Sequence, residues 1–179
     1  GLDLDETALV ECLAIGAHAV RRAGIQAHEY VLVIGAGPIG LGTMQFAKAE
    51  GAKVIAMDLI DDRLSFCKQE LGVDFAINAA NDVQIALAEI TGGDFPTVVM
   101  DASGNSESMG NALNLLSHGG RLVYIGLFIG DFRLNDPEFH KREATLLSSR
   151  NATRADFRHV IDLMKNGMVK AKPFITHRA

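Results

Sequence analysis

A glycine-rich segment at residues 35–40 reads GAGPIG and lies between an apolar stretch and a segment with helical spacing. In such a G-x-G-x-x-G pattern, Gly35 permits a tight turn, Gly37 lets the main chain approach a pyrophosphate, and Gly40 lets the helix pack on the preceding strand. The amino end of a helix also favours negative charge. The pattern alone is weak, because glycine turns without a ligand also match it. Its place between a strand and a helix predicts a dinucleotide site.

A second feature is Asp58, which follows the apolar stretch 53–57. It lies near the ~20-residue distance at which an acid meets the adenosine ribose. A carboxylate there accepts hydrogen bonds from ribose hydroxyls and repels a 2′-phosphate, so it favours NAD over NADP. The alternative is a turn residue at the end of a strand, beside Asp61 and Asp62. Arg63 is either a contact to the adenosine or an ordinary surface arginine, and both interpretations stay open.

Apolar runs and helical spacing alternate along the rest of the chain. Strands are expected over 30–34, 53–57, 75–77, 97–100, 121–125 and 144–147, and helices over 5–23, from the glycine turn to 49, and over 61–71, 82–90, 106–116 and 156–165. The first helix is expected to be capped within residues 5–7, and the stretch around Pro137 is expected to be irregular. This alternation predicts an α/β fold with a doubly wound, six-stranded parallel sheet and helices on both faces, the Rossmann arrangement.

Composition narrows the class of protein further. The 179 residues are 48% hydrophobic, and the net charge of −5 comes with no basic block, which argues against nucleic acid and anionic membranes as partners. There is no apolar run of eighteen residues. Cys12 and Cys67 lie far apart without a CxxC pattern, which argues against disulfides and zinc fingers. We therefore expect a cytoplasmic protein with a linking helix at 1–24 and a nucleotide-binding domain at 25–179.

Several stretches, spread over nearly the whole chain, resemble the sequences of one protein family. Residues 11–23 are similar to a Glu-Pro-Leu segment of the zinc-type medium-chain dehydrogenases, and 148–153 and 172–178 are similar to their polyol, threonine and sugar-acid branch. The glycine turn and Asp58 agree with this. The resemblance covers the nucleotide-binding domain only.

The resemblance implies a set of cofactor contacts. They are Pro38 and Ile39 at the pyrophosphate, Asp58 and Arg63 at the adenosine, Ile125, Gly126 and Leu127 at the nicotinamide, and Arg150 near the phosphates, with Ala102 and Ser103 bordering the same crevice. Most of these positions follow strands. In open α/β sheets ligands gather at the carboxyl ends of the strands, so topology agrees with the resemblance.

The resemblance also implies a catalytic zinc, held by a Cys and a His-Glu pair in a separate N-terminal domain. The sequence has none of these motifs, so we expect the catalytic zinc domain to be absent from this chain. Glu11 is the one candidate metal residue, as a ligand or neighbour of zinc in the complete protein. Cys12 stands where the family usually has Pro, and an acid simply solvated on the first helix is the alternative. Lone histidines without a Cys or carboxylate at metal spacing receive no role.

The expected function is hydride transfer from a primary or secondary alcohol to NAD, with zinc polarising the oxygen in the complete protein, while the isolated chain is inactive. A stand-alone dinucleotide-binding or redox-sensing module is the alternative from another class. The expected partners are a small-molecule alcohol and a second copy of the chain, in a homodimer or tetramer formed through the sixth strand. Neither the substrate nor the direction of reaction follows from the sequence.

Overall fold

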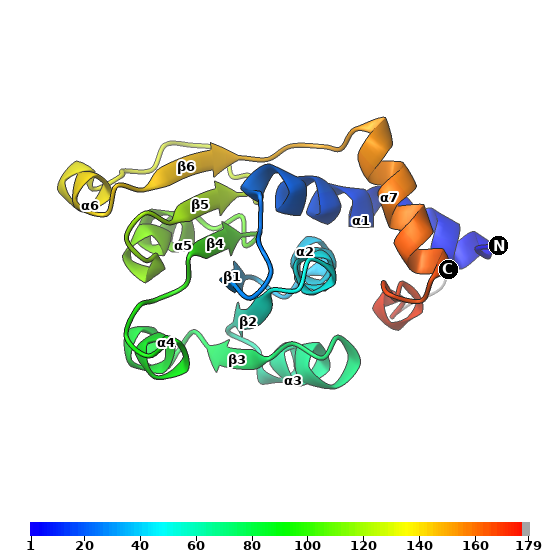
Figure 1. Ribbon diagram of the computed structural model, residues 1–179, viewed down its shortest axis with the longest axis horizontal. Helices are drawn as coiled ribbons and strands as arrows, with labels where there is room; N and C mark the ends of the chain where they lie inside the picture. Colours follow the sequence, from blue (N-terminus) through cyan, green and yellow to red (C-terminus); the bar gives the residue numbers. More distant parts are fainter. Residues whose placement is uncertain (177–179) are drawn as a thin grey trace.

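The computed structural model describes residues 1–176, and the six strands in this part form one all-parallel sheet (Figure 1). The strands are β1 (Tyr30–Ile34), β2 (Lys53–Asp58), β3 (Phe75–Asn78), β4 (Val98–Asp101), β5 (Arg121–Tyr124) and β6 (Thr145–Ser148). Their order is β3-β2-β1-β4-β5-β6, so the winding direction reverses between β1 and β4. This confirms the predicted doubly wound Rossmann sheet, in which ligands are expected to bind at the carboxyl ends of the strands where the winding direction reverses.

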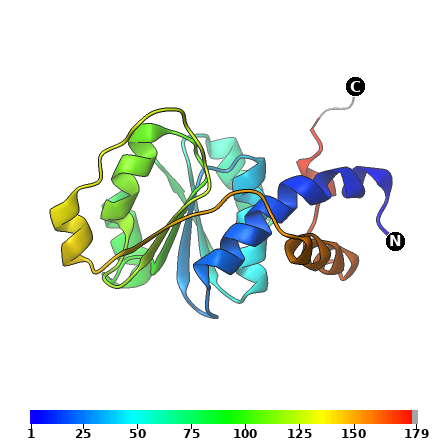
Figure 2. The same cartoon turned by 90° about the horizontal axis from the view of Figure 1, so that it is seen from above.

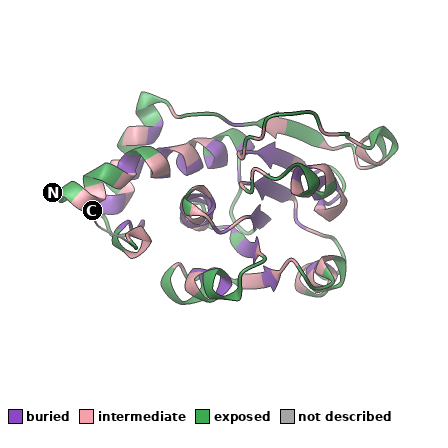
Figure 3. Cartoon of the chain, turned by 180° about the vertical axis from the view of Figure 1, so that it is seen from behind, coloured by how far each residue is buried: buried purple, intermediate pink, exposed green. Residues whose placement is uncertain are grey.

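Helices cover both faces of the sheet, as Figure 2 shows. They are α1 (Leu4–Ala23), α2 (Pro38–Ala49), α3 (Asp61–Glu70), α4 (Val83–Thr91), α5 (Ser106–Asn111), α6 (Asp136–Lys141) and α7 (Arg154–Lys165), with 3₁₀ turns η1 (Ala112–Leu115) and η2 (Lys172–Phe174) in the described part. Alternate residues of the strands face two apolar clusters. Val31 and Val33 pack with α1, α2 and α7, whereas Leu32 and Ile34 pack with α4, α5 and η1. The central strands are therefore buried on both sides (Figure 3).

The first helix is fixed by close packing. A Cβ atom on Gly16 would lie 2.7 Å from the backbone nitrogen of Thr43, so α1 and α2 approach more closely than side chains at this point would allow. The buried residues of α1 belong to the same cluster as those of α2 and α7.

Within residues 1–176, no helix has the length and apolar character needed to cross a membrane. The division of the chain at residue 24 stays a prediction.

Three details differ from the expected elements. The cap of α1 is Asp3, whose carboxylate accepts the Glu6 N–H while Glu6 reaches back, so the cap expected within 5–7 is wrong. The helix expected to reach 116 leaves α geometry after Asn111. The stretch around Pro137 is not wholly irregular, because α6 forms with Pro137 in its first turn, where a missing N–H costs nothing. Residues 177 and 178 of the family-like stretch lie outside the described residues.

Candidate functional site

The glycine turn joins β1 directly to α2. Gly35 has a φ of 93°, and its N–H donates to the Met57 carbonyl at 2.8 Å. A Cβ on Gly40 would lie 1.8 Å from the Gly35 carbonyl oxygen, so only glycine fits there. At Gly37, the cap residue of α2, a Cβ would meet no heavy atom of the described residues within 4 Å other than those of its two chain neighbours. The turn therefore leaves open space in front of the amino end of α2, where an anionic group can approach.

Asp58 lies beside this turn at the end of β2. Its side chain is only 8% exposed, and Oδ2 accepts the Ala36 N–H at 2.7 Å, while Oδ1 accepts the Ile60 N–H at 3.0 Å. Nη1 of Arg63 lies 3.6 Å from Oδ2. The structure thus brings Asp58 and Arg63 together next to the glycine turn. Asp58 does serve as a turn residue, and the same hydrogen bonds orient its carboxylate toward the end of β1.

A buried carboxylate organises the loop after β4. Asp101 is fully buried, and its Oδ1 accepts the N–H and the hydroxyl of Ser103 at 2.8 and 2.6 Å. Its Oδ2 accepts the Ser108 hydroxyl at 2.6 Å. No lysine or arginine of residues 1–176 forms an ion pair with it. The sequence placed this loop at the crevice, but the role of the Asp101 carboxylate in holding the loop was not predicted. The serines two and seven residues later in the sequence were the signal that could have shown it.

The backbone of Asp101 ties this loop to the one after β5. Its carbonyl accepts the N–H groups of Ile125 and Gly126 at 2.8 and 2.9 Å. A Cβ on Gly126 would lie 2.4 Å from the Gly104 nitrogen, so the two loops pack backbone to backbone. Leu127 follows with 87% of its surface exposed. The predicted nicotinamide segment is therefore held rigidly at its start and is open to solvent at its end.

The loops after β1 and β4 also meet. A Cβ on Gly35 would lie 3.2 Å from the carbonyl carbon of Ala102 and from two backbone atoms of Ser103. The three loops that follow β1, β4 and β5 thus form one edge of the molecule, as the sequence predicts. Arg150 is exposed and comes after Ser149, whose N–H donates to the Tyr124 carbonyl at 2.9 Å, so it lies at this edge too.

Two ionisable groups near these elements have shifted pKa values. Burial and the nearby Asp101 raise the pKa of Tyr124 to about 12, and its hydroxyl donates to the Met109 carbonyl at 2.6 Å. Burial and Glu11 raise the pKa of the Cys12 thiol. Both groups therefore stay protonated at neutral pH, and neither is prepared to act as a base.

The metal candidate Glu11 is exposed on α1. Across the part of the chain that the structure describes, no three His, Cys, Asp or Glu side chains come close enough to hold a metal ion. These residues by themselves therefore do not fit a catalytic zinc, which needs about three protein ligands.

Comparison with known proteins agrees with this geometry. The family model described as zinc-binding dehydrogenase matches residues 38–166. The chain belongs to this family. Its curated relatives include L-galactonate-5-dehydrogenase of Escherichia coli strain K12, 46% identical, and a sorbitol dehydrogenase of Halalkalibacterium halodurans, 32% identical. Each match covers 99% of this chain and 52% of the relative, so the chain spans about half the length of the curated relatives it matches.

Solved structures of similar proteins show the same fold. An alcohol dehydrogenase from E. coli CFT073 complexed with NADH has a TM-score of 0.83 and 31% identity, with 92% of this chain and 48% of that chain covered. A zinc-binding dehydrogenase from Sinorhizobium meliloti 1021 bound to NADP has a TM-score of 0.86 and 27% identity, with 94% and 50% covered. Both nicotinamide cofactors thus occur among similar structures.

Proposed function

We propose that this zinc-binding dehydrogenase chain is the NAD-binding domain of an enzyme that oxidises a polyol or sugar acid. The observation that carries the proposal is the position of Asp58, whose carboxylate is fixed beside an open glycine turn. A carboxylate so placed accepts ribose hydroxyls and disfavours a 2′-phosphate. One similar structure is bound to NADP, and Asp58 is the reason to prefer NAD for this chain.

Different residues of the crevice would contact different parts of the cofactor. Gly37, Pro38 and Ile39 would hold the pyrophosphate at the amino end of α2, assisted by Arg150. Asp58 and Arg63 would bind the adenosine. The main chain of Ile125–Leu127 would align the nicotinamide, and Ala102 and Ser103 would border it. The bound nicotinamide supplies the acceptor for a hydride from the alcohol carbon.

The substrate class rests on the relatives. One is named for L-galactonate and another for sorbitol, so a polyol or sugar-acid alcohol is the class we propose for the complete protein. Zinc belongs to the same proposal for the complete protein, with Glu11 as a candidate ligand or neighbour of the ion. A cytoplasmic, reducing location remains our expectation, and both cysteines are free in the structure.

A fluorescence titration with NADH tests the proposal. Gly37→Ala places a methyl group in the open space before α2, so NADH affinity is expected to fall about 10-fold or more because the pyrophosphate can no longer approach the main chain. Because no heavy atom of residues 1–176 lies within 4 Å of that methyl group, apart from residue 37 and its two neighbours in the chain, the unfolding midpoint should not fall. Gly110→Ala makes the same change in α5, where the nearest atom is the Arg133 carbonyl oxygen at 3.9 Å, and serves as the matched control.

Two results would contradict the proposal. One is an unmodified chain that shows no saturable NADH binding. The other is a Gly37→Ala variant that binds NADH as tightly as the Gly110→Ala control.

A further inference from the structure

The buried acid Asp101 is joined by hydrogen bonds to both loops that are proposed to contact the nicotinamide. It immediately precedes Ala102 and Ser103, and its Oδ1 accepts the Ser103 N–H at 2.8 Å. Its main-chain carbonyl accepts the N–H groups of Ile125 and Gly126 at 2.8 and 2.9 Å. The side chain has no exposed surface. Asp101 therefore lies directly behind the part of the crevice where the cofactor ring is proposed to bind.

The hydrogen bonds of Asp101 are those of a charged carboxylate. The hydroxyls of Ser103 and Ser108 each lie 2.6 Å from one of its oxygens, within the range of O–H groups that donate to an ionised acid. The Ser103 oxygen also accepts the Asn105 N–H at 3.1 Å, which leaves its own proton for Asp101. No lysine or arginine in the described part of the chain pairs with Asp101, so no neighbouring cation neutralises its charge.

The charge is the property of Asp101 that an asparagine would not reproduce. An asparagine oxygen can accept from Ser103, and its NH₂ group can donate to the Ser108 hydroxyl, which is able to rotate and accept. A buried charge without a cation costs free energy that a neutral amide of the same shape does not. Such a charge is screened less than one in water, so it acts on a charged group that binds nearby.

We propose that the Asp101 charge raises the affinity of the crevice for the oxidised cofactor relative to the reduced one. The nicotinamide ring of NAD⁺ is positively charged and that of NADH is neutral, whereas their adenosine and pyrophosphate groups are the same. The negative charge of Asp101 therefore stabilises bound NAD⁺ more than bound NADH. This bias favours alcohol oxidation, in which NAD⁺ binds and NADH leaves. The inference rests on the proposed function, because it needs the cofactor in the crevice.

The ratio of the NAD⁺ and NADH dissociation constants of the chain is the readout. Fluorescence titration gives the constant for NADH, and competition against NADH gives that for NAD⁺. Asp101→Asn should raise the ratio Kd(NAD⁺)/Kd(NADH) about three-fold or more, because it removes the charge and keeps the hydrogen bonds. Asp101→Ser, which is neutral and smaller, should raise it as well. Partial unfolding of a variant raises both apparent constants by the same factor, so the ratio still reports the charge.

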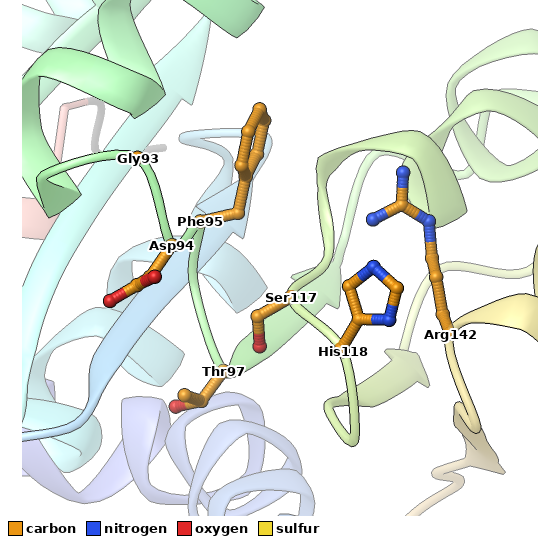
Figure 4. A pocket seen from close by; sticks show the side chains of 7 residues that line it. All are labelled: Gly93, Asp94, Phe95, Thr97, Ser117, His118 and Arg142. Atoms are coloured by element: carbon orange, nitrogen blue, oxygen red, sulfur yellow. The ribbon is translucent and has the colours of Figure 1, made fainter.

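Two control variants separate the charge from other effects. Ser108→Ala removes a hydrogen bond to Asp101 but keeps its charge, so the ratio should stay the same even if both affinities fall. Asp94→Asn removes the charge of an exposed acid on the segment that leads to Thr97 and β4, at the other end of the strand from Asp101 (Figure 4). It should also leave the ratio unchanged.

The results that would overturn the two proposals are different. No saturable binding of either cofactor form by the unmodified chain would overturn the proposed function, and this inference with it. Binding of both forms with the same ratio in the unmodified chain and in both Asp101 variants would overturn this inference alone. So would a rise of similar size in Ser108→Ala or Asp94→Asn, because the effect would then not come from the charge of Asp101.

Discussion

We expect Asp58 to be the residue that decides between NAD and NADP. NAD is expected to bind at least about 10-fold more tightly than NADP, because a 2′-phosphate beside the buried carboxylate adds like-charge repulsion. Asp58→Ser should narrow this ratio. The variant also loses the acceptor for Ala36 N–H, so the ratio of the two affinities, measured by titration, is more informative than either affinity alone. Asp62→Ser, an exposed acid on α3, is the control. Equal affinities of the unmodified chain would remove Asp58 from the ribose site.

A different carboxylate, Asp156, joins α1 to α7. It is 2% exposed and accepts hydrogen bonds from Arg21 Nε and Thr153 N–H, each at 2.7 Å, and its Oδ2 lies 2.8 Å from His18 Nδ1. Burial raises the pKa of Asp156, but these hydrogen bonds, that from Arg21 foremost, more than offset it and hold the pKa well below its usual value.

A lowered pKa in the folded state stabilises the protein above the pKa of the unfolded state, which is about 3.9, and this contribution is lost as the pH falls below that value. Asp156→Asn is therefore expected to reduce the free energy of unfolding at pH 7 by about 2 kcal/mol. The difference from the unmodified chain should shrink steadily below about pH 4. Urea unfolding at several pH values measures it, with the exposed Asp162→Asn as control. Parallel pH profiles for the Asp156→Asn variant and the unmodified chain would disprove this account.

The positions of some site residues could be predicted from the sequence, but their hydrogen-bond partners could not. Asp58 could be placed at the crevice because its distance from the glycine turn is set by the length of one βαβ unit. The donor to its carboxylate, Ala36 N–H, could not be predicted, because it depends on how the turn closes in space. Asp101 shows the same limit. An acid at a strand end is ordinary in sequence, and only the fold shows that it is fully buried among hydroxyl and amide donors.

Helices and strands were predicted best where burial of their side chains determines the pattern of apolar residues. The central strands are continuous apolar runs because both of their faces are covered, and their ends differ from expectation by about a residue. The six-residue α6 was missed, because it has no buried residue and therefore no apolar spacing to detect. Its signals are local, an Asn135 cap and Pro137 in the first turn. The order of the strands in the sheet could not be predicted from any residue pattern, because it depends on pairing between segments that are distant in the sequence.

The edge strand β6 carries the prediction about assembly. Thr145 N–H and Ser149 N–H donate to β5 at the Gly120 and Tyr124 carbonyls, so the alternate residues Leu146 and Ser148 direct their N–H groups away from the sheet. Leu146 is also 39% exposed. We expect two copies to pair along this edge in a dimer, because unpaired strand edges and apolar side chains are then both covered.

Leu146→Pro should give a monomer, since it removes an outward N–H without touching the bonds to β5. Leu146→Thr keeps the N–H and should remain dimeric, which separates backbone pairing from side-chain contact. Light scattering at several concentrations measures both variants. A monomeric unmodified chain at high concentration, or a dimer that survives Leu146→Pro, would argue against pairing through β6.

At the scale of the whole molecule, the sheet separates two kinds of surface. Its carboxyl edge gathers the glycine turn, Asp58 and the loops tied by Asp101, which are the parts that a dinucleotide needs. Its amino edge carries the turns that precede β4, β5 and β6 and none of the proposed cofactor contacts.

The last prediction concerns what this chain does alone. It is expected to bind NADH but neither to retain zinc after dialysis nor to oxidise sorbitol or L-galactonate. The proposed cofactor contacts lie on loops that the sheet already fixes. Zinc needs about three protein ligands, whereas the resemblance supplies only Glu11, which stands exposed and without a metal-binding cluster in residues 1–176. Metal analysis, an NADH titration and an assay of NADH production test the three statements on one preparation. Stoichiometric zinc with measurable turnover would contradict this prediction and would direct the search for ligands to the histidines.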